Sequence, residues 1–312
     1  MNGAIAFVWD NFGPLHVDRC NAVAGDLAES TVYGIELFAR SQLYDWHQPD
    51  ATRFEKVTLF AEGGWNSVGA LSLGRAIANA ILERNCSSAF LAHYDQLAIL
   101  YAAIRLRAKG VAVFTMGCSK FDDAPRKGWR EWVKRQFLKP YQGAIGSHDR
   151  STDYWKLLGL SGDRIFGGYN TVDQTRIRAL AAAGGAGEAA FADRPFLAVA
   201  RLIWEKNLPG LLRAYADYRQ QAEGPRRLVI AGSGPLESVL KTQAEKLGIA
   251  RYVDWLGFVQ TEQVAPLMRN ALCLCLPSVS ETFGNVVPEA LAVELPVLIS
   301  AQCGAADADA DA

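Results

Sequence analysis

Short apolar runs alternate with amphipathic helical patterns along nearly all of this 312-residue chain. This alternation constrains the fold most strongly, because strands that are each followed by a helix pair in parallel and form an α/β sheet. In the first half, predicted helices at 68–83 and 96–108 lie among strand-like runs at 4–9, 31–37, 57–61, 89–93, 111–116 and 143–147.

A small, Gly/Ala-rich and aperiodic stretch at 181–193 interrupts the pattern and is predicted to be a linker. The alternation then restarts, with Asn207 as a suitable helix N-cap and Pro209 in the first helical turn. Strands are predicted at 196–200, 227–231, 252–256, 272–276 and 297–300, and helices at 208–220, 236–247, 262–270 and 285–293. The predicted fold class is therefore α/β, with two Rossmann-like parallel-sheet domains at 1–180 and 194–304. The alternating Ala/Asp stretch at 305–312 is predicted to be a disordered acidic tail.

The composition excludes several classes of function. With 50% hydrophobic residues, 21% charged residues and a net charge of −1, the chain has no basic excess that would favour a nucleic-acid partner. It shows neither a secretory signal pattern nor an apolar run long enough to span a bilayer, so we expect a cytoplasmic protein. The six cysteines lack zinc-like spacing, and we expect free thiols and no metal site. Cys273 and Cys275 are expected on one face of a strand.

Two cations, Arg201 and Lys206, come between a predicted strand and the next predicted helix. Ligands of open α/β sheets bind at the carboxyl ends of strands, and cations beside a helix start suit a diphosphate. The alternative is that both are solvated loop charges.

A second strand runs into Gly232-Ser233-Gly234 before a helix. Such glycines allow a ligand to approach the backbone closely, although a simple tight turn explains them equally well. The stretch is not a dinucleotide fingerprint, because Glu237 stands in place of the third glycine.

The most specific motif has Glu281 and Glu289 separated by seven residues. Glu281 is expected on a loop after a strand, and Glu289 in the opening turns of the following helix. The backbone of Phe283, Gly284 and Asn285 between them would present amides to an anion. The alternative for Glu289 is a favourable charge near a helix start.

Together, Arg201, Lys206, Gly234 and the Glu281/Glu289 pair resemble glycosyltransferase family 4, whose members are retaining enzymes of the GT-B fold, with two Rossmann-like domains facing a cleft. The resemblance implies that Arg201 and Lys206 hold the diphosphate of a nucleotide-sugar donor. It also implies that Glu281 contacts the donor sugar and that Glu289 binds the ribose. The reaction would transfer the sugar to an acceptor hydroxyl of unknown identity in polysaccharide or glycoconjugate synthesis, without a cofactor.

In the first domain, Gly13 lies where the family has a glycine-rich loop that faces the donor phosphates. Many members carry a histidine after the fifth strand, where this chain has Gly117 and Cys118. His148, His93 or a nearby carboxylate is therefore the candidate on the acceptor side, and His93 has a structural role as its alternative.

The resemblance also exposes two departures. Glu294 stands where the family has a glycine that closes a helix, so a left-handed residue with a side chain is expected there. Family members continue beyond the equivalent of Gly304, so the second domain is expected to be incomplete.

Residues 126–139, from Arg126 to Lys139, contain six basic residues and one acid, with aromatic residues at helical spacing. A basic helix with tryptophans suits peripheral contact with an anionic membrane at its inner face. The alternative, which the pattern favours somewhat, is a helix that buries its aromatic stripe and leaves a basic face in water.

Two other functions fit parts of the pattern. Loss of the final segment would leave an inactive glycosyltransferase-like binding protein. A dinucleotide-dependent oxidoreductase would also have Rossmann-like domains, but it leaves the two glutamates unexplained.

Overall fold

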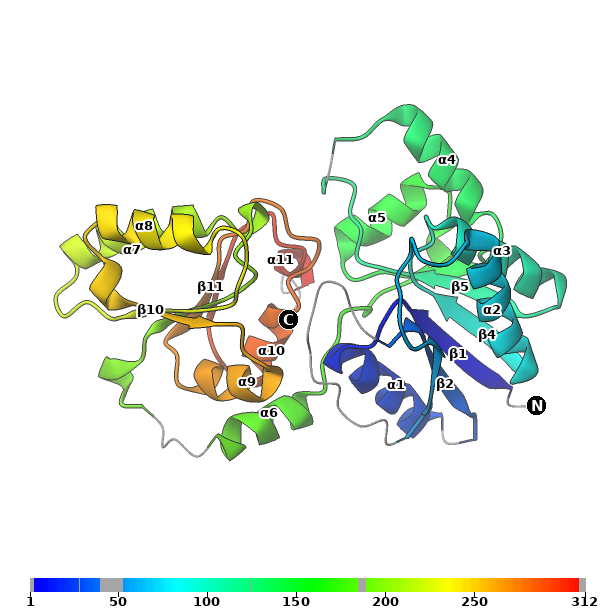
Figure 1. Cartoon of the computed structure of the whole chain (residues 1–312), viewed down its shortest axis with the longest axis horizontal. Coiled ribbons are helices and arrows are strands. Elements are labelled where there is room, and N and C mark those ends of the chain that lie inside the picture. The colour runs from blue at the N-terminus through cyan, green and yellow to red at the C-terminus, as the bar shows by residue number, and fades with distance from the viewer. Residues whose placement is uncertain (1–2, 28, 40–52, 124, 185–188, 309–312) are drawn as a thin grey trace. The chain divides into compact units, whose positions relative to one another are not determined.

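The computed structural model describes residues 3–27, 29–39, 53–123, 125–184 and 189–308. It divides into two compact units, Met1–Thr171 and Val172–Ala312, each built around its own parallel sheet (Figure 1). The expected fold class of two Rossmann-like α/β domains is confirmed.

The N-terminal unit contains a seven-stranded sheet in the order β3-β2-β1-β4-β5-β6-β7, in which every described pairing is parallel. The order reverses between β1 and β4, as in doubly wound folds. Its strands are β1 (Ala4–Trp9), β2 (Val32–Phe38), β3 (Glu55–Phe60), β4 (Cys86–Leu91), β5 (Ala112–Met116), β6 (Gly143–Ile145) and β7 (Ile165–Phe166).

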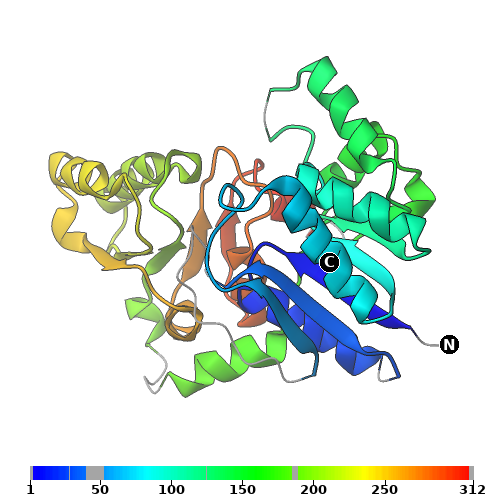
Figure 2. The same ribbon diagram turned by 45° about the vertical axis from the view of Figure 1, so that its right-hand side comes forward.

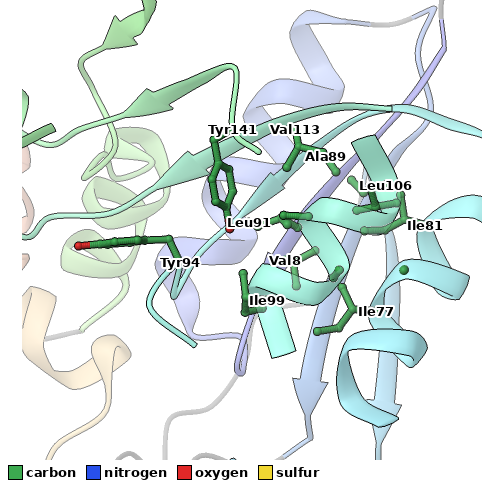
Figure 3. Close-up of a cluster of buried hydrophobic side chains, with 14 of the residues drawn as sticks. Val8, Ile77, Ile81, Ala89, Leu91, Tyr94, Ile99, Leu106, Val113 and Tyr141 are labelled. Atoms are coloured by element: carbon green, nitrogen blue, oxygen red, sulfur yellow. The ribbon is translucent and has the colours of Figure 1, made fainter. Parts of the chain in front are cut away.

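Helices cover both faces of this sheet (Figure 2). They are α1 (Pro14–Asp26), α2 (Ala70–Glu83), α3 (Leu97–Ala108), α4 (Gly128–Leu138) and α5 (Asp149–Leu157). Successive strand side chains point to opposite faces, so Val8 joins the core under α2 and α3, whereas Phe7 packs in the second core beside α1. Figure 3 shows the first of these cores, in which Ile77, Ile81 and Ile99 cover the central strands.

The C-terminal unit repeats this plan with a five-stranded parallel sheet in the order β10-β9-β8-β11-β12. Helices α7 and α8 lie on one face, and α6 and α9 lie on the other (Figures 1 and 2). The elements are α6 (Gln174–Ala183), β8 (Phe196–Val199), α7 (Leu208–Gln221), β9 (Leu228–Ala231), α8 (Glu237–Lys246), β10 (Val253–Gly257), α9 (Thr261–Arg269), β11 (Cys273–Leu276), α10 (Val286–Ala292), β12 (Val297–Ile299) and α11 (Ala305–Ala308).

Helix α6 corrects the expected start of the linker. Residues 181–183 form its last turn, and Ile177 and Ala181 pack against Ala265 and Ala292 of the C-terminal unit. The division between units therefore comes before α6, at Thr171, because apolar contact with α9 and α10 orders a segment whose small residues give no periodic signal. Of the expected linker, residues 185–188 lie outside the described residues.

The expectation of disorder from residue 305 onward is wrong for 305–308, which form α11. Ala305 is buried, and its N–H donates to the Phe283 carbonyl at 2.8 Å. A stretch with little to bury is thus ordered by a backbone hydrogen bond to the neighbouring loop. Residues 309–312 of the expected tail lie outside the described residues.

Two further local expectations change. Strand β4 ends at Leu91, two residues before the expected end, because His93 has a positive φ of 57°. Asn207 does precede α7, but its side chain makes no capping bond and instead donates to the Pro277 carbonyl at 3.2 Å.

Glu294 has the left-handed conformation expected of it, with φ of 61°. None of the helices in the described ranges is both long and apolar enough to cross a bilayer.

Candidate functional site

The strand order of the C-terminal sheet places two loops side by side at its carboxyl edge. Strands β8 and β11 are neighbours, although the chain between them builds β9 and β10 on the far side. The order of the sheet therefore reverses here, and ligands of open α/β sheets bind at such switch points. The two loops are tied together, since the Val279 N–H donates to the Glu205 carbonyl at 2.9 Å.

Lys206 and Glu281, one from each loop, form an ion pair at this switch point. The Lys206 Nζ donates to the Glu281 Oε2, and the two side chains are only 16% and 11% exposed. The Ser278 hydroxyl lies 3.5 Å from the same carboxylate oxygen. Partly desolvated charges must be paired, so each holds the other in position. The structure thus joins two candidate residues that are 75 positions apart in the chain.

Arg201 and Glu289 lie on the same two connections. Arg201 is exposed on the loop that follows β8, five residues before Lys206. Glu289 is partly buried in the first turn of α10, the helix that follows the Glu281 loop. The donor-binding roles expected of these residues remain predictions.

The loop from Glu281 to Asn285 depends on a glycine with positive φ. Gly284 has φ of 95°, and a Cβ there would lie 2.8 Å from Cys303 Sγ and 3.0 Å from Leu276 Cδ2. Phe283 is buried, and its carbonyl accepts the Cys303 thiol at 2.8 Å. Burial raises the pKa of that thiol to about 11, so it stays protonated and able to donate. Asn285 occupies the N-cap of α10 without a side-chain capping bond.

Gly232 and Gly234 allow the loop after β9 to approach the loop after β8. A Cβ on Gly232 would lie 1.9 Å from the Ala200 carbonyl oxygen, and one on Gly234 would lie 2.6 Å from the Leu202 carbonyl oxygen. The Leu202 N–H donates to the Ser233 carbonyl at 2.9 Å. Close backbone packing is thus a sufficient reason for both glycines, and donor contact by Gly234 stays a prediction.

The switch point of the N-terminal sheet lies between β1 and β4, and a contact between a histidine and an aspartate bridges it. His93 Nε2 lies 3.2 Å from Asp10 Oδ1, and both side chains are about one-third exposed. Burial alone would raise the pKa of Asp10, but the hydrogen bond and charge of His93 outweigh it and lower that pKa. The prediction singled out His93 but missed Asp10, whose position directly after the first strand was the available signal.

The loop after β1 that contains Gly13 is held in place by a hydrogen bond from its backbone to a side chain. Gly13 is the N-cap of α1, and its N–H donates to His16 Nδ1 at 2.9 Å. Burial, assisted by the Arg19 charge, lowers the pKa of His16 to about 3, so the ring is neutral and able to accept this bond. Sequence reasoning missed His16, although a polar ring three residues into a helix start is a capping signal.

Among the described acids of the N-terminal unit, Glu36 is the most deeply buried, at 1% exposure. Its carboxylate accepts the Phe12 N–H at 3.1 Å and the Thr58 hydroxyl at 2.7 Å, and it pairs with Lys56 at 2.9 Å. It therefore anchors the loop that precedes Gly13. The prediction missed Glu36, and its signal was a carboxylate inside the otherwise apolar strand β2.

His148, the other acceptor-side candidate, is buried and serves as the N-cap of α5. Its Nδ1 accepts the Ser151 N–H at 3.3 Å. The structure thus gives His148 a capping role, and an acceptor-side role remains a prediction.

Comparisons with known proteins relate this chain to glycosyltransferases. Residues 191–312, which contain the candidate residues of the C-terminal unit, match the model of the family described as glycosyl transferases group 1. An alpha-monoglucosyldiacylglycerol synthase of Streptococcus pneumoniae is 34% identical over 106 residues, which are 34% of this chain and 24% of that protein. A putative colanic acid biosynthesis glycosyltransferase of Salmonella typhimurium is 25% identical over 267 residues, which are 77% of this chain and 62% of that protein. The chain thus spans less than two thirds of the length of either relative.

Solved structures extend the similarity in fold to both units. HepE of Anabaena, solved in complex with UDP and glucose, aligns with a TM-score of 0.67 at 17% identity, over 97% of this chain and 82% of that one. WaaG, a glycosyltransferase involved in lipopolysaccharide biosynthesis, aligns with a TM-score of 0.61 at 16% identity, over 98% and 84% of the two chains. The chain therefore has the two-domain Rossmann-like fold of these solved structures, and residues 191–312 match the family model of the glycosyl transferases group 1.

Proposed function

We propose that this chain is a retaining glycosyltransferase of the family 4 type, which moves a sugar from a nucleoside-diphosphate-sugar to an acceptor hydroxyl without a cofactor. The observation that carries the proposal is the Lys206–Glu281 pair at the switch point between β8 and β11. The family match of residues 191–312 and the UDP complex of HepE support a nucleotide-sugar as the donor. The sugar-transferring relatives support a role in the synthesis of a polysaccharide or glycoconjugate.

In this proposal the Lys206–Glu281 ion pair holds Lys206 in position until the donor binds. The diphosphate competes with the Glu281 carboxylate for Lys206, and Arg201 supplies a second positive charge from the same loop. Glu281 is then free to accept a hydrogen bond from a sugar hydroxyl, and Glu289 accepts one from the ribose. Preorganised cations stabilise negative charge as it develops on a leaving group, and this is the main demand of the reaction.

The proposed chemical step exchanges one C–O bond for another. The acceptor oxygen bonds to the anomeric carbon on the face from which the diphosphate departs, and the bond from that carbon to the diphosphate oxygen breaks. The acceptor proton passes to the departing phosphate oxygen. This front-face course retains the anomeric configuration and requires no protein nucleophile, in keeping with the family resemblance.

The test begins with a thermal-shift screen of UDP-, GDP- and ADP-sugars, because a ligand that binds only the folded state raises Tm. The best donor is then incubated with the protein, and release of the nucleoside diphosphate is measured with and without candidate acceptors. Lys206→Met is expected to lower turnover by about 100- to 1,000-fold. Lys246→Met, on the exposed surface of α8, is the matched control and is expected to retain full activity.

Each alternative function predicts a different result in these assays. Donor binding without release of the diphosphate would indicate an inactive binding protein. Binding of NADH but of no nucleotide-sugar would favour the oxidoreductase. Near-normal turnover of Lys206→Met would contradict the role assigned to the ion pair.

A further inference from the structure

Helix α4 presents two tryptophans to solvent. Trp129 is 65% exposed and Trp132 is 62% exposed, and their spacing of three residues places them on one side of the helix. The expectation that this aromatic stripe is buried is therefore wrong for both tryptophans. Leu138 is the buried residue of α4, and Phe137 is partly buried against the core.

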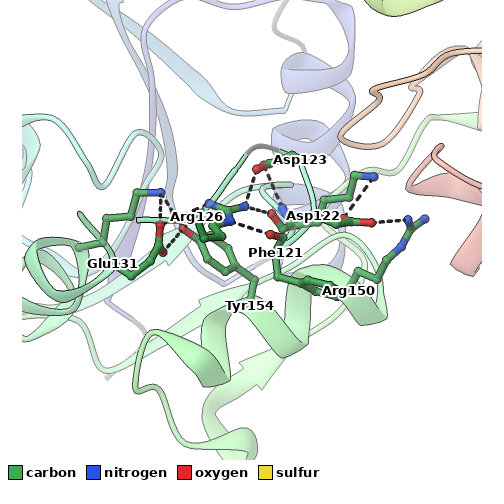
Figure 4. A network of polar contacts seen from close by, with 9 residues as sticks. Phe121, Asp122, Asp123, Arg126, Glu131, Arg150 and Tyr154 are labelled. Atoms are coloured by element: carbon green, nitrogen blue, oxygen red, sulfur yellow. Dashed lines mark hydrogen bonds and ion pairs between the residues drawn. The ribbon is translucent and has the colours of Figure 1, made fainter. Parts of the chain in front are cut away.

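The opposite side of α4 is held by a polar network (Figure 4). Buried Tyr154 of α5 donates its hydroxyl to Glu131 at 2.8 Å and accepts from Lys134 at 2.6 Å and from Arg126 at 3.0 Å. Arg135 donates to the Leu157 carbonyl at 2.6 Å. Because these bonds fix the rotation of the helix, α4 cannot turn its tryptophans inward without breaking them.

The network pairs some charges of residues 126–139 and leaves others exposed. Glu131, the acid of α4, is paired inside the network with Arg126 and Lys134. Lys127 and Arg130 are exposed, and within the described ranges no ion pair joins either of them to a carboxylate. The Arg130 guanidinium lies 5.3 Å from the centre of the Trp129 ring. The exposed surface of α4 thus combines the two tryptophans with the positive charge of Arg130, and Lys127 adds a further exposed charge at the N-cap.

We propose that the exposed tryptophans of α4, together with Arg130 and the N-cap residue Lys127, dock on an anionic membrane surface. Tryptophan suits the headgroup level of a bilayer, because its ring is apolar and its N–H remains hydrated. Lys127 and Arg130 would lie against the lipid phosphates, and each basic residue near an anionic surface strengthens binding by about fivefold. Charge complementarity favours lipid over an apolar protein partner, which would leave these cations uncompensated. The proposal goes beyond the transferase function and does not depend on it.

The test measures co-sedimentation of the full chain with vesicles of phosphatidylcholine alone or mixed with phosphatidylglycerol. Two double variants probe the surface: Trp129→Ser/Trp132→Ser and Lys127→Glu/Arg130→Glu. Arg107→Glu/Lys109→Glu, at the exposed end of α3, makes the same change in net charge, and Leu71→Ser/Leu97→Ser removes other exposed apolar side chains. Lys134 and Arg135 are avoided because their bonds hold the helix in place.

The wild type is expected to bind the mixed vesicles at least tenfold more strongly than phosphatidylcholine alone. Both α4 variants are expected to lose at least tenfold in binding, the control variants are expected to stay within twofold, and all are expected to keep the wild-type far-UV circular dichroism spectrum. The proposal is overturned if the wild type ignores phosphatidylglycerol, if the α4 variants bind normally, or if the α3 charge reversal weakens binding equally. Self-association through α4 without vesicle binding would show that a second copy of the chain, rather than lipid, covers this surface.

Discussion

Replacement of Glu294 by glycine should stabilise the C-terminal unit. Glu294 follows α10 with φ of 61°, and its N–H donates to the Leu291 carbonyl at 3.0 Å. The Leu295 N–H donates to the Ala290 carbonyl at 3.0 Å, so the helix ends in a Schellman motif that requires a left-handed residue at position 294.

The magnitude follows from two opposing terms. A side chain in the left-handed region costs about 1–2 kcal/mol, and glycine removes that cost. Glycine also gives the unfolded chain more freedom, which costs about 0.4–1 kcal/mol of stability. At the middle of both ranges the free energy of unfolding rises by about 0.8 kcal/mol, which corresponds to an increase in Tm of about 3 °C for a unit of this size.

Differential scanning calorimetry of the full chain measures this shift. Glu294→Ala is the matched control, because it removes the same side-chain charge but keeps the Cβ, and its Tm should stay within about 1 °C of the wild type. An equal rise in both variants would mean that the glutamate side chain, and not the backbone conformation, is the destabilising element. Failure of Glu294→Gly to raise Tm would refute the reasoning altogether.

Three further predictions concern the supports of the two sheet edges. Gly232→Ala should lower the free energy of unfolding by about 3 kcal/mol, because the added Cβ would meet the Ala200 carbonyl. Gly167→Ala is the control: its Cβ would meet open space, so the free energy of unfolding should change by less than about 0.5 kcal/mol. Urea titration measures both variants. Burial lowers the folded-state pKa of His16 to about 3 from the ordinary 6.5, so its contribution to stability is complete above pH 6.5 and is lost as the pH falls toward 3. In urea titrations across that range, the free energy of unfolding of His16→Asn should therefore fall less steeply with decreasing pH than that of the wild type. Glu36→Leu should lower the free energy of unfolding by about 3 kcal/mol, because it removes the carboxylate that the Phe12 N–H and the Lys56 ammonium bind. A decrease below about 1 kcal/mol in urea titration would contradict the anchoring role of Glu36.

Periodicity was sufficient to predict the α/β class and most of the strands. Strand β1 has the bounds expected from its apolar run, and α3 begins one residue later than expected. Local physics explains this success, because a strand buried on both faces must be apolar throughout its length and a helix needs a continuous face. The left-handed Glu294 was expected from the family resemblance, which places a helix-closing glycine at this position, and not from periodicity.

Contacts between distant segments decided what the sequence left open. Helix α6 belongs to the C-terminal unit because α9 and α10 bury its small side chains, and residues 305–308 are helical because the Phe283 loop binds them. The outward direction of Trp129 and Trp132 depends on where Tyr154 of another helix holds α4. Spacing along the chain could nominate Lys206 and Glu281, but only the reversal of strand order between β8 and β11 brings them together. The physical reason is that local patterns determine which element forms, whereas long-range packing determines which side chains meet and which remain in water.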